Sequence, residues 1–170
     1  MGNRFQNPGG FTLIELVAVI SIIGMMLFFA IPRLDNTGEP EGDLKTASRW
    51  ILLNVQALKS RSVTEHKSFA LHAGFDDNAF SIVDLSPPEQ TAAAHSPKEY
   101  RLPAGVVLTD VEYPKKGTVS IQGTDIYFYK KGYSDKAIIH LKDEEGGIHS
   151  IVIEPFLPSA RLYDEYVAFN

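Results

Sequence analysis

The sequence predicts an α+β protein, in which an N-terminal transmembrane helix leads to an amphipathic second helix packed on an antiparallel, sandwich-like β-sheet head. Three observations predict this fold class: one long apolar run near the N-terminus, a following segment with apolar residues at spacings of three and four, and then short β-type runs separated by turn residues. The 170 residues, 44% hydrophobic and 22% charged, are typical of one globular domain. We therefore expect a single head without internal repeats.

The charge balance and the missing cysteines exclude several classes of function. With 16 Lys+Arg against 21 Asp+Glu, the formal net charge is -5, which disfavours non-specific binding of nucleic acid. The absence of cysteine excludes disulfides, Cys-ligated zinc, a thiol nucleophile and a lipidated cysteine. Proteins are therefore the expected partners.

The apolar run extends from Phe11 to Ile31 and contains one charged residue. A helix of this length, at 1.5 Å per residue, spans roughly 30 Å, the thickness of a bilayer core. A cleaved secretory peptide has a shorter apolar stretch of about 7–15 residues, followed by small residues at the cut. The sequence therefore predicts a transmembrane helix over residues 11–32, after a polar leader, residues 1–10, whose final glycine pair is open to a protease.

The single charge of this run, Glu15, requires an explanation. An unpaired carboxylate held deep in lipid costs about 2.5 kcal/mol or more. Cleavage after Gly10 would create an α-amino group on Phe11, and in an assembly the amine of a neighbouring subunit could reach Glu15. We interpret Glu15 as an assembly device.

The string GFTLIE at residues 10–15, followed by an apolar helix with Pro32 at its end, resembles the type IV prepilin family, which includes type IV pilins and the pseudopilins of type II secretion. The resemblance implies that a prepilin peptidase cuts after Gly10 on the cytoplasmic side and methylates the new N-terminal Phe11. It also implies an assembly role for Glu15 and a helix-bending role for Pro32.

After the apolar run, residues 33–42 are predicted to break the helix, because residues 35–42 include two glycines and a proline and no apolar residue. A second helix is expected over residues 43–66, with Asp43 as its cap. Its apolar residues recur on one face, which we expect to pack on the head: Leu44, Ala47, Ile51, Val55 and Leu58. Its cations, Lys45, Arg49, Lys59 and Arg61, are expected on a solvated face, and Trp50 is expected to be a core or rim anchor.

The β-rich part of the head, residues 67–170, contains runs with β propensity between turn signals. A proline-bounded surface loop is expected over residues 86–97. The expected strands are 67–73, 79–85, 106–113, 118–122, 125–130, 136–142, 148–154 and 160–167. The sequences RLPAGV at 101–106 and IYFYKKG at 126–132, with the turn at 143–147 and the segment around Pro155, resemble the head of the H-type minor pseudopilin, which packs its helix on antiparallel sheets.

No catalytic or metal-binding pattern is present in the sequence. The five histidines (His66, His72, His95, His140, His149) do not form an HExxH motif. If Glu144-Glu145 forms a hairpin tip, His140 and His149 would face each other, but zinc requires three or four ligands. The sequence also lacks GxSxG, GxGxxG and Walker motifs. We expect no enzyme activity, no cofactor, no metal and no small-molecule substrate.

The favoured hypothesis is a minor pseudopilin, a structural subunit of the type II secretion pseudopilus that helps export folded proteins. It would be a single-pass protein of the inner membrane with a periplasmic head, and its partners would be the prepilin peptidase and other pseudopilins. The alternatives are a minor type IV pilin with a pilus or DNA-uptake role and a signal-anchored periplasmic enzyme. The head, residues 43–170, has a net charge of -3. Its basic clusters, Lys115-Lys116 and Lys130-Lys131, are small, so we expect no nucleic-acid binding.

Overall fold

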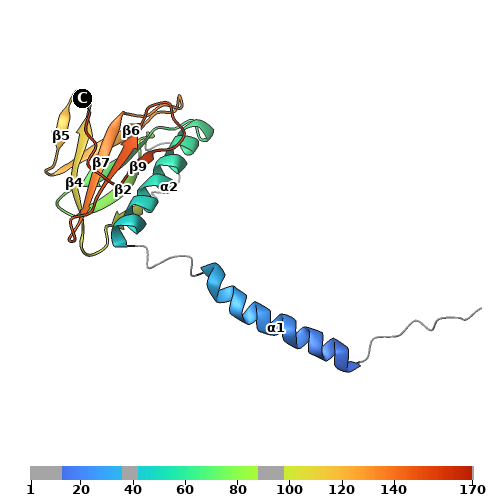
Figure 1. The fold of residues 1–170 in the computed structure, drawn as a ribbon. Helices are drawn as coiled ribbons and strands as arrows, with labels where there is room; N and C mark the ends of the chain where they lie inside the picture. The colour runs from blue at the N-terminus through green and yellow to red at the C-terminus, as the bar shows by residue number, and fades with distance from the viewer. Residues whose placement is uncertain (1–12, 36–41, 88–97, 170) are drawn as a thin grey trace, which may run out of the picture. The chain divides into compact units, whose positions relative to one another are not determined.

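The protein is described from a computed structural model that covers residues 13–35, 42–87 and 98–169 (Figure 1). The chain divides into two compact units, Met1–Pro40 and Glu41–Asn170. Helix α1, Leu13–Asp35, is the described part of the first unit. The second unit is the head, which contains helix α2, Asp43–Thr64, and all the described strands. The α+β fold class predicted from the sequence is confirmed.

Helix α2 buries the face that its spacing predicts. Leu44, Ala47, Ile51, Val55 and Leu58 are all buried. Burying an aliphatic side chain of this size contributes roughly 1.5–3 kcal/mol. The helix is therefore anchored by its own apolar stripe on the head, as Figure 1 shows by its position along the strands.

The start of α2 differs from the sequence prediction. The residue at the cap position is Gly42, whose carbonyl accepts hydrogen bonds from the backbone N–H groups of Lys45 (2.8 Å) and Thr46 (3.1 Å). Asp43 is the first helical residue and makes no capping hydrogen bond through its side chain. The predicted Asp43 cap is wrong, although a negative charge in the first turn still interacts favourably with the helix dipole.

Nine strands of the described chain form two antiparallel sheets. The first sheet has the order β3-β2-β1-β6 and the second the order β5-β4-β7-β8-β9. The bounds are β1 Phe69–Gly74, β2 Ala79–Asp84, β3 Lys98–Arg101, β4 Val106–Tyr113, β5 Gly117–Val119, β6 Gly123–Phe128, β7 Ala137–Asp143, β8 Ile148–Ile153 and β9 Arg161–Tyr163. Strand β3 is not predicted from the sequence, because its four residues show no apolar alternation; its pairing with β2 creates it.

Both sheets and α2 enclose one hydrophobic core. Its largest fully buried side chains include Phe69, Phe80 and Phe128 from the first sheet, together with aliphatic residues of the second sheet and of α2. Trp50 of α2 is half-buried at the rim and stacks on Tyr100 of β3 with the ring centroids 4.2 Å apart. Trp50 is thus a rim anchor, as the sequence predicts.

Strand β6 lies at an edge of the first sheet, and neighbouring groups occupy its outer backbone positions. The hydroxyl of Tyr113 donates a hydrogen bond to the carbonyl of Asp125 at 3.0 Å. The backbone N–H of Tyr127 donates to the carboxylate of Asp135 at 3.1 Å, and the carbonyl of Tyr127 accepts from the N–H of Asp135 at 2.9 Å. This edge is therefore already hydrogen-bonded within the head.

Candidate functional site

The processing junction proposed from the sequence lies outside the described residues. Gly10 and Phe11 both precede residue 13, where the description begins. Cleavage after Gly10 and methylation of Phe11 therefore stay predictions, to be tested by experiment.

Glu15 lies in the first turn of α1, on an exposed stretch of the helix. A carboxylate at this position interacts favourably with the positive end of the helix dipole. The large apolar side chains around it are also exposed within the described part of α1: Leu13, Ile14, Leu16, Val17, Val19, Ile20, Ile22, Ile23, Met25 and Met26. Within the described residues, no helix combines the length and the hydropathy that crossing a membrane requires.

The region around Pro32 differs in extent from the sequence prediction. Helix α1 continues through Pro32 and ends at Asp35. Residues 33–35, assigned from the sequence to a break, are thus helical, while residues 36–41 lie outside the description and residue 42 precedes α2. The helix extends farther because Arg33 and Leu34 favour helix, and the glycines and proline on which the predicted break rests begin only at Gly38.

Lys59 is the clearest polar feature of α2. Its side chain is buried, with 7% of its surface exposed, and its ammonium donates hydrogen bonds to the carbonyls of Glu154 (2.5 Å), Pro155 (3.4 Å) and Leu157 (2.7 Å). Burial lowers the pKa of Lys59, and the nearby charge of Glu154 opposes that shift. The sequence places Lys59 on a solvated face, and that prediction is wrong: the residue follows Val55 by four positions and so shares the buried face.

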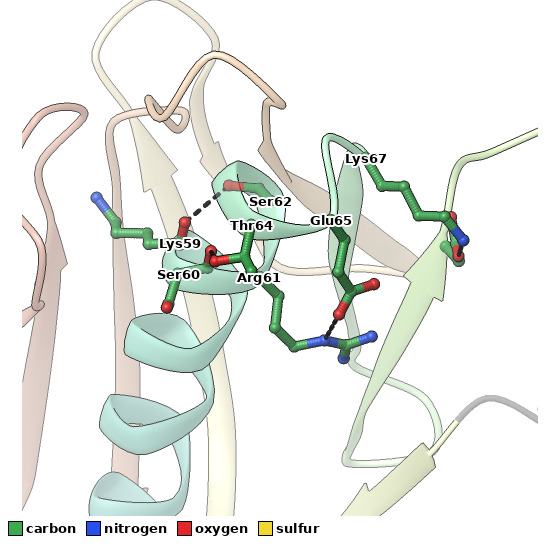
Figure 2. Close-up of polar contacts among 8 residues, drawn as sticks. Lys59, Ser60, Arg61, Ser62, Thr64, Glu65 and Lys67 are labelled. Carbon is green, nitrogen blue, oxygen red and sulfur yellow. Dashed lines mark hydrogen bonds and ion pairs between the residues drawn. The ribbon is translucent and has the colours of Figure 1, made fainter.

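Figure 2 shows the contrast with the neighbouring cation of the same helix. Arg61 turns away from Lys59 and pairs with Glu65 at 2.8 Å, with both side chains well exposed. Its guanidinium also lies 4.6 Å from the centre of the Phe69 ring. An exposed pair of this kind contributes only about 0.3–0.5 kcal/mol. Arg61 therefore behaves as the sequence predicts, and Lys59 does not.

A second buried polar network fixes the C-terminal segment, residues 164–169, which we call the strap. His140 of β7 contacts Asp110 through Nδ1 at 2.6 Å and the carbonyl of Val167 through Nε2 at 2.8 Å. Each ring nitrogen of His140 thus has a hydrogen-bond partner within the head, one on β4 and one in the strap. Ser150, which pairs with His140 across the strands, donates to the carbonyl of Glu165 at 2.6 Å.

The strap replaces the second half of the last predicted strand. The sequence predicts a strand over residues 160–167, but β9 ends at Tyr163. Beyond it, the Val167 N–H donates to the Ser150 hydroxyl at 3.0 Å, and the Phe169 N–H donates to the Glu112 carboxylate at 3.1 Å. Side chains of β8 and β4 thus satisfy backbone groups that a longer strand would have paired.

The register of β7 and β8 overturns the expected facing of two histidines. His140 pairs with Ser150, and Leu141 pairs with His149, so the two imidazoles point to opposite faces of the sheet. Nδ1 of His149 lies 2.7 Å from the hydroxyl of Ser48 on α2. Among the described residues, no three His, Asp or Glu side chains form a group that could hold a metal ion.

The comparisons with known proteins give separate results for the two ends of the chain. Residues 6–31 match the family described as the prokaryotic N-terminal methylation motif. No curated protein matches the sequence.

Among solved structures, the chain is similar to the minor pseudopilin EpsH from the type 2 secretion system of Vibrio cholerae. One EpsH structure has a TM-score of 0.55 at 11% identity and covers 72% of this chain and 97% of EpsH. A crystal structure of EpsH has a TM-score of 0.57 at 10% identity and covers 76% of this chain and 99% of EpsH. At this identity the likeness establishes a shared fold. The chain thus combines a prepilin-type N-terminus with a pseudopilin fold, and both resemblances stated from the sequence are confirmed.

Proposed function

We propose that this chain is a minor pseudopilin, a structural subunit of the type II secretion pseudopilus that helps export folded proteins. The observation that carries the proposal is the coincidence of two independent features in one chain. A methylation motif occupies residues 6–31, and a separate head has the fold of a minor pseudopilin. The motif alone would fit a type IV pilin equally well, so the fold of the head makes secretion the favoured system.

In this proposal the prepilin peptidase cuts after Gly10 and methylates Phe11. Residues 11–32 then hold the protein in the inner membrane by a single pass, with the head in the periplasm. Exposed apolar side chains around α1 support this arrangement, because a helix that is apolar all round requires an apolar environment. Glu15 pairs with the Phe11 amine of a neighbouring subunit during assembly. The partners are other pseudopilins, and the role is structural.

Processing is the most direct test. In cells that contain a prepilin peptidase, Gly10→Val should leave the precursor uncut, because the peptidase must accommodate a backbone with almost no side chain. Gly2→Val, in the same leader, serves as the control and should be processed normally. Intact-mass spectrometry of the wild-type protein should find a chain that begins at methylated Phe11; any other N-terminus rejects the proposal.

Assembly is tested separately through Glu15. Glu15→Gln should insert and be processed, because removing a charge makes burial in lipid easier, but it should join filaments poorly. Ser21→Ala is a matched loss of a polar group on α1, because the Ser21 hydroxyl donates to the Val17 carbonyl of its own helix at 2.8 Å. Sheared filaments probed for each variant give the measurement. Equal incorporation of Glu15→Gln and wild type would contradict the pairing with the amine.

The alternative, a minor type IV pilin that binds DNA, predicts a basic surface on the head. Lys115 and Lys116 line a hollow that also holds Asp125 and Asp135, so their charge is partly balanced. Salt-dependent binding of DNA by the protein, lost on replacing the lysines of both clusters, would favour the pilin over the pseudopilin.

A further inference from the structure

An exposed apolar patch lies at the end of the head where α2 ends. Phe156 has 83% of its surface exposed, and the flanking side chains of Leu157 and Tyr133 are about one-third exposed, at 36% and 37%. The Tyr133 and Phe156 rings are neighbours, with centroids 6.3 Å apart, and Tyr133 stacks on Tyr129 at 4.6 Å. We call Tyr133, Phe156 and Leu157 the Phe156 patch. Exposed aromatic clusters of this kind commonly mark protein contacts.

Hydrogen bonds from inside the head fix the backbone around Phe156. Lys59 donates to the carbonyls on both sides of it, those of Pro155 and Leu157, and the Ser134 N–H donates to the Pro155 carbonyl at 3.1 Å. A buried ammonium is costly unless its donors are used, and here they fix the loop. The loop that carries Phe156 is therefore already ordered, so binding a partner costs little further conformational entropy, which favours the contact.

The patch has a positive margin. Lys130 and Lys131 are exposed in the turn that precedes Tyr133 and closes through Gly132, whose φ is 87°. None of the described ion pairs involves either lysine. A surface that covers the Phe156 patch should therefore be apolar at its centre and acidic at its margin.

A surface with these properties lies at the other end of the same head. It is an open hollow of about 430 Å³, lined by Gly105, residues 107–109 and residues 142–144. Val107 supplies an exposed apolar wall, and the carboxylates of Asp143 and Glu144 outnumber the single ammonium of Lys142 in this lining. We call it the Glu144 hollow. Its volume lies within the range of about 300–1,000 Å³ typical of binding sites, so it can admit an aromatic side chain.

The two surfaces lie at opposite ends because α2 runs beside β8 in the same direction. Near its start, α2 contacts the start of β8 through Ser48 and His149, and near its end it contacts the chain beyond β8 through Lys59. The Glu144 hollow adjoins the turn before β8, and Phe156 follows the end of β8. At about 3.3 Å per residue, β8 alone separates them by roughly 17 Å.

A second hollow of the head fits the patch less well. It measures about 410 Å³ and is lined by residues 113–116, Asp125, Tyr127 and residues 135–136. Its lining contains three lysines and two aspartates, so its margin would repel Lys130 and Lys131.

We propose that the Phe156 patch of one copy of this chain docks into the Glu144 hollow of a second copy. The contact joins unlike surfaces, so a pair of copies leaves one patch and one hollow free for further contacts. The contact is small and therefore weak by itself, but copies held in one membrane or filament meet at a high effective concentration. The inference rests on the proposed function only in one respect, namely that copies are held together in one membrane or filament.

Site-specific disulfide formation tests the contact cleanly, because the chain contains no cysteine. Full-length Phe156→Cys and Val107→Cys proteins are produced together in the same cells, with distinguishable tags, and oxidised in the cell envelope. We expect a disulfide-linked dimer that contains both tags, at least about tenfold more abundant than with either variant alone. A bridge within one copy is excluded, because each copy carries a single cysteine.

Two controls separate this contact from random collision. Ile121→Cys places a thiol on another exposed apolar residue of the head and should give only background dimer with Val107→Cys. Adding Lys131→Glu to the Phe156→Cys copy should lower the dimer yield roughly two- to fivefold, and adding Glu144→Lys to the other copy should restore it.

Three results would overturn the inference: a dimer formed equally well by Phe156→Cys alone, a yield no higher than that of Ile121→Cys, or disulfides formed only with other proteins. The N-terminus of the same samples is measured by mass spectrometry. Correct processing at Phe11 without the mixed dimer rejects the contact and leaves the proposed function standing. An unprocessed chain rejects the proposed function itself.

Discussion

The two helices have almost the same length, 23 residues in α1 and 22 in α2, yet opposite distributions of apolar side chains. Helix α2 has one apolar stripe that is buried against both sheets of the head, with Leu53 and Val63 exposed outside it. Helix α1 has them on all sides, and its described apolar side chains are exposed. Helix α2 is thus stabilised by packing within the head, whereas the described apolar side chains of α1 lack such packing.

Each helix also carries one charged residue among its apolar positions, Lys59 in α2 and Glu15 in α1. The partners of these two charges differ as the environments of the two helices do. The ammonium of Lys59 is satisfied by carbonyls of the head itself. Glu15, by contrast, is proposed to pair with the Phe11 amine of another subunit. The comparison predicts that substitutions in α2 act on folding and that substitutions in α1 act on assembly.

The largest difference is expected between two matched isoleucines. Ile51 of α2 is fully buried, so Ile51→Ala should lower the free energy of unfolding by about 2–5 kcal/mol. Ile20 of α1 is 60% exposed, and Ile20→Ala should leave the unfolding of the head unchanged within about 0.5 kcal/mol. Urea denaturation, monitored through Trp50, measures both. Equal effects of the two substitutions would contradict the independence of the helices.

An intermediate effect is expected from the buried cation of α2. Lys59→Met should destabilise the head by about 1–3 kcal/mol, because the carbonyls of residues 154, 155 and 157 lose their donor. Arg61→Met, two positions along the same helix, should cost only a few tenths of a kcal/mol. The measurement is the midpoint of urea unfolding. A Lys59→Met head as stable as the wild type would mean that water replaces the ammonium at no cost.

The smallest effect concerns alkaline pH. Burial raises the pKa of Tyr113 to about 12, and its hydrogen bond with Thr124 opposes the shift. The unfolded chain, with a tyrosine pKa near 10, loses this proton first, so the free energy of unfolding falls between about pH 10 and 12. Tyr113→Phe should cost about 1 kcal/mol at neutral pH, and this deficit should narrow above pH 10. Because α1 contains no tyrosine, the full chain and the head should respond alike.

The parts of the fold that the sequence predicts are those that depend on local spacing. The apolar stripe of α2 and seven of the eight expected strands agree with the structure to within a few residues, because a period of about 3.6 or of 2 is visible without knowing any partner. The last expected strand is the exception, since β9 covers only its first residues and the strap follows.

What the sequence does not predict depends on contacts between distant residues. Lys59 is buried because carbonyls 95 to 98 positions away accept its hydrogens, and the spacing alone does not reveal them. The pairing of β7 with β8 places His140 and His149 one residue out of register. Because successive side chains of a strand point to opposite faces, the two imidazoles lie on opposite faces of the sheet. The Asp110–His140 pair joins strands 30 positions apart.

The hydrogen-bonded edge of β6 has a consequence for a chain that is proposed to join a filament. An open strand edge is a template on which any extended peptide can add, which leads to disordered aggregates instead of a defined filament. By engaging the backbone of Asp125 and Tyr127, Tyr113 and Asp135 remove this template from one side of the head. Growth by strand addition is thereby blocked at β6, so ordered assembly there must proceed through side-chain surfaces.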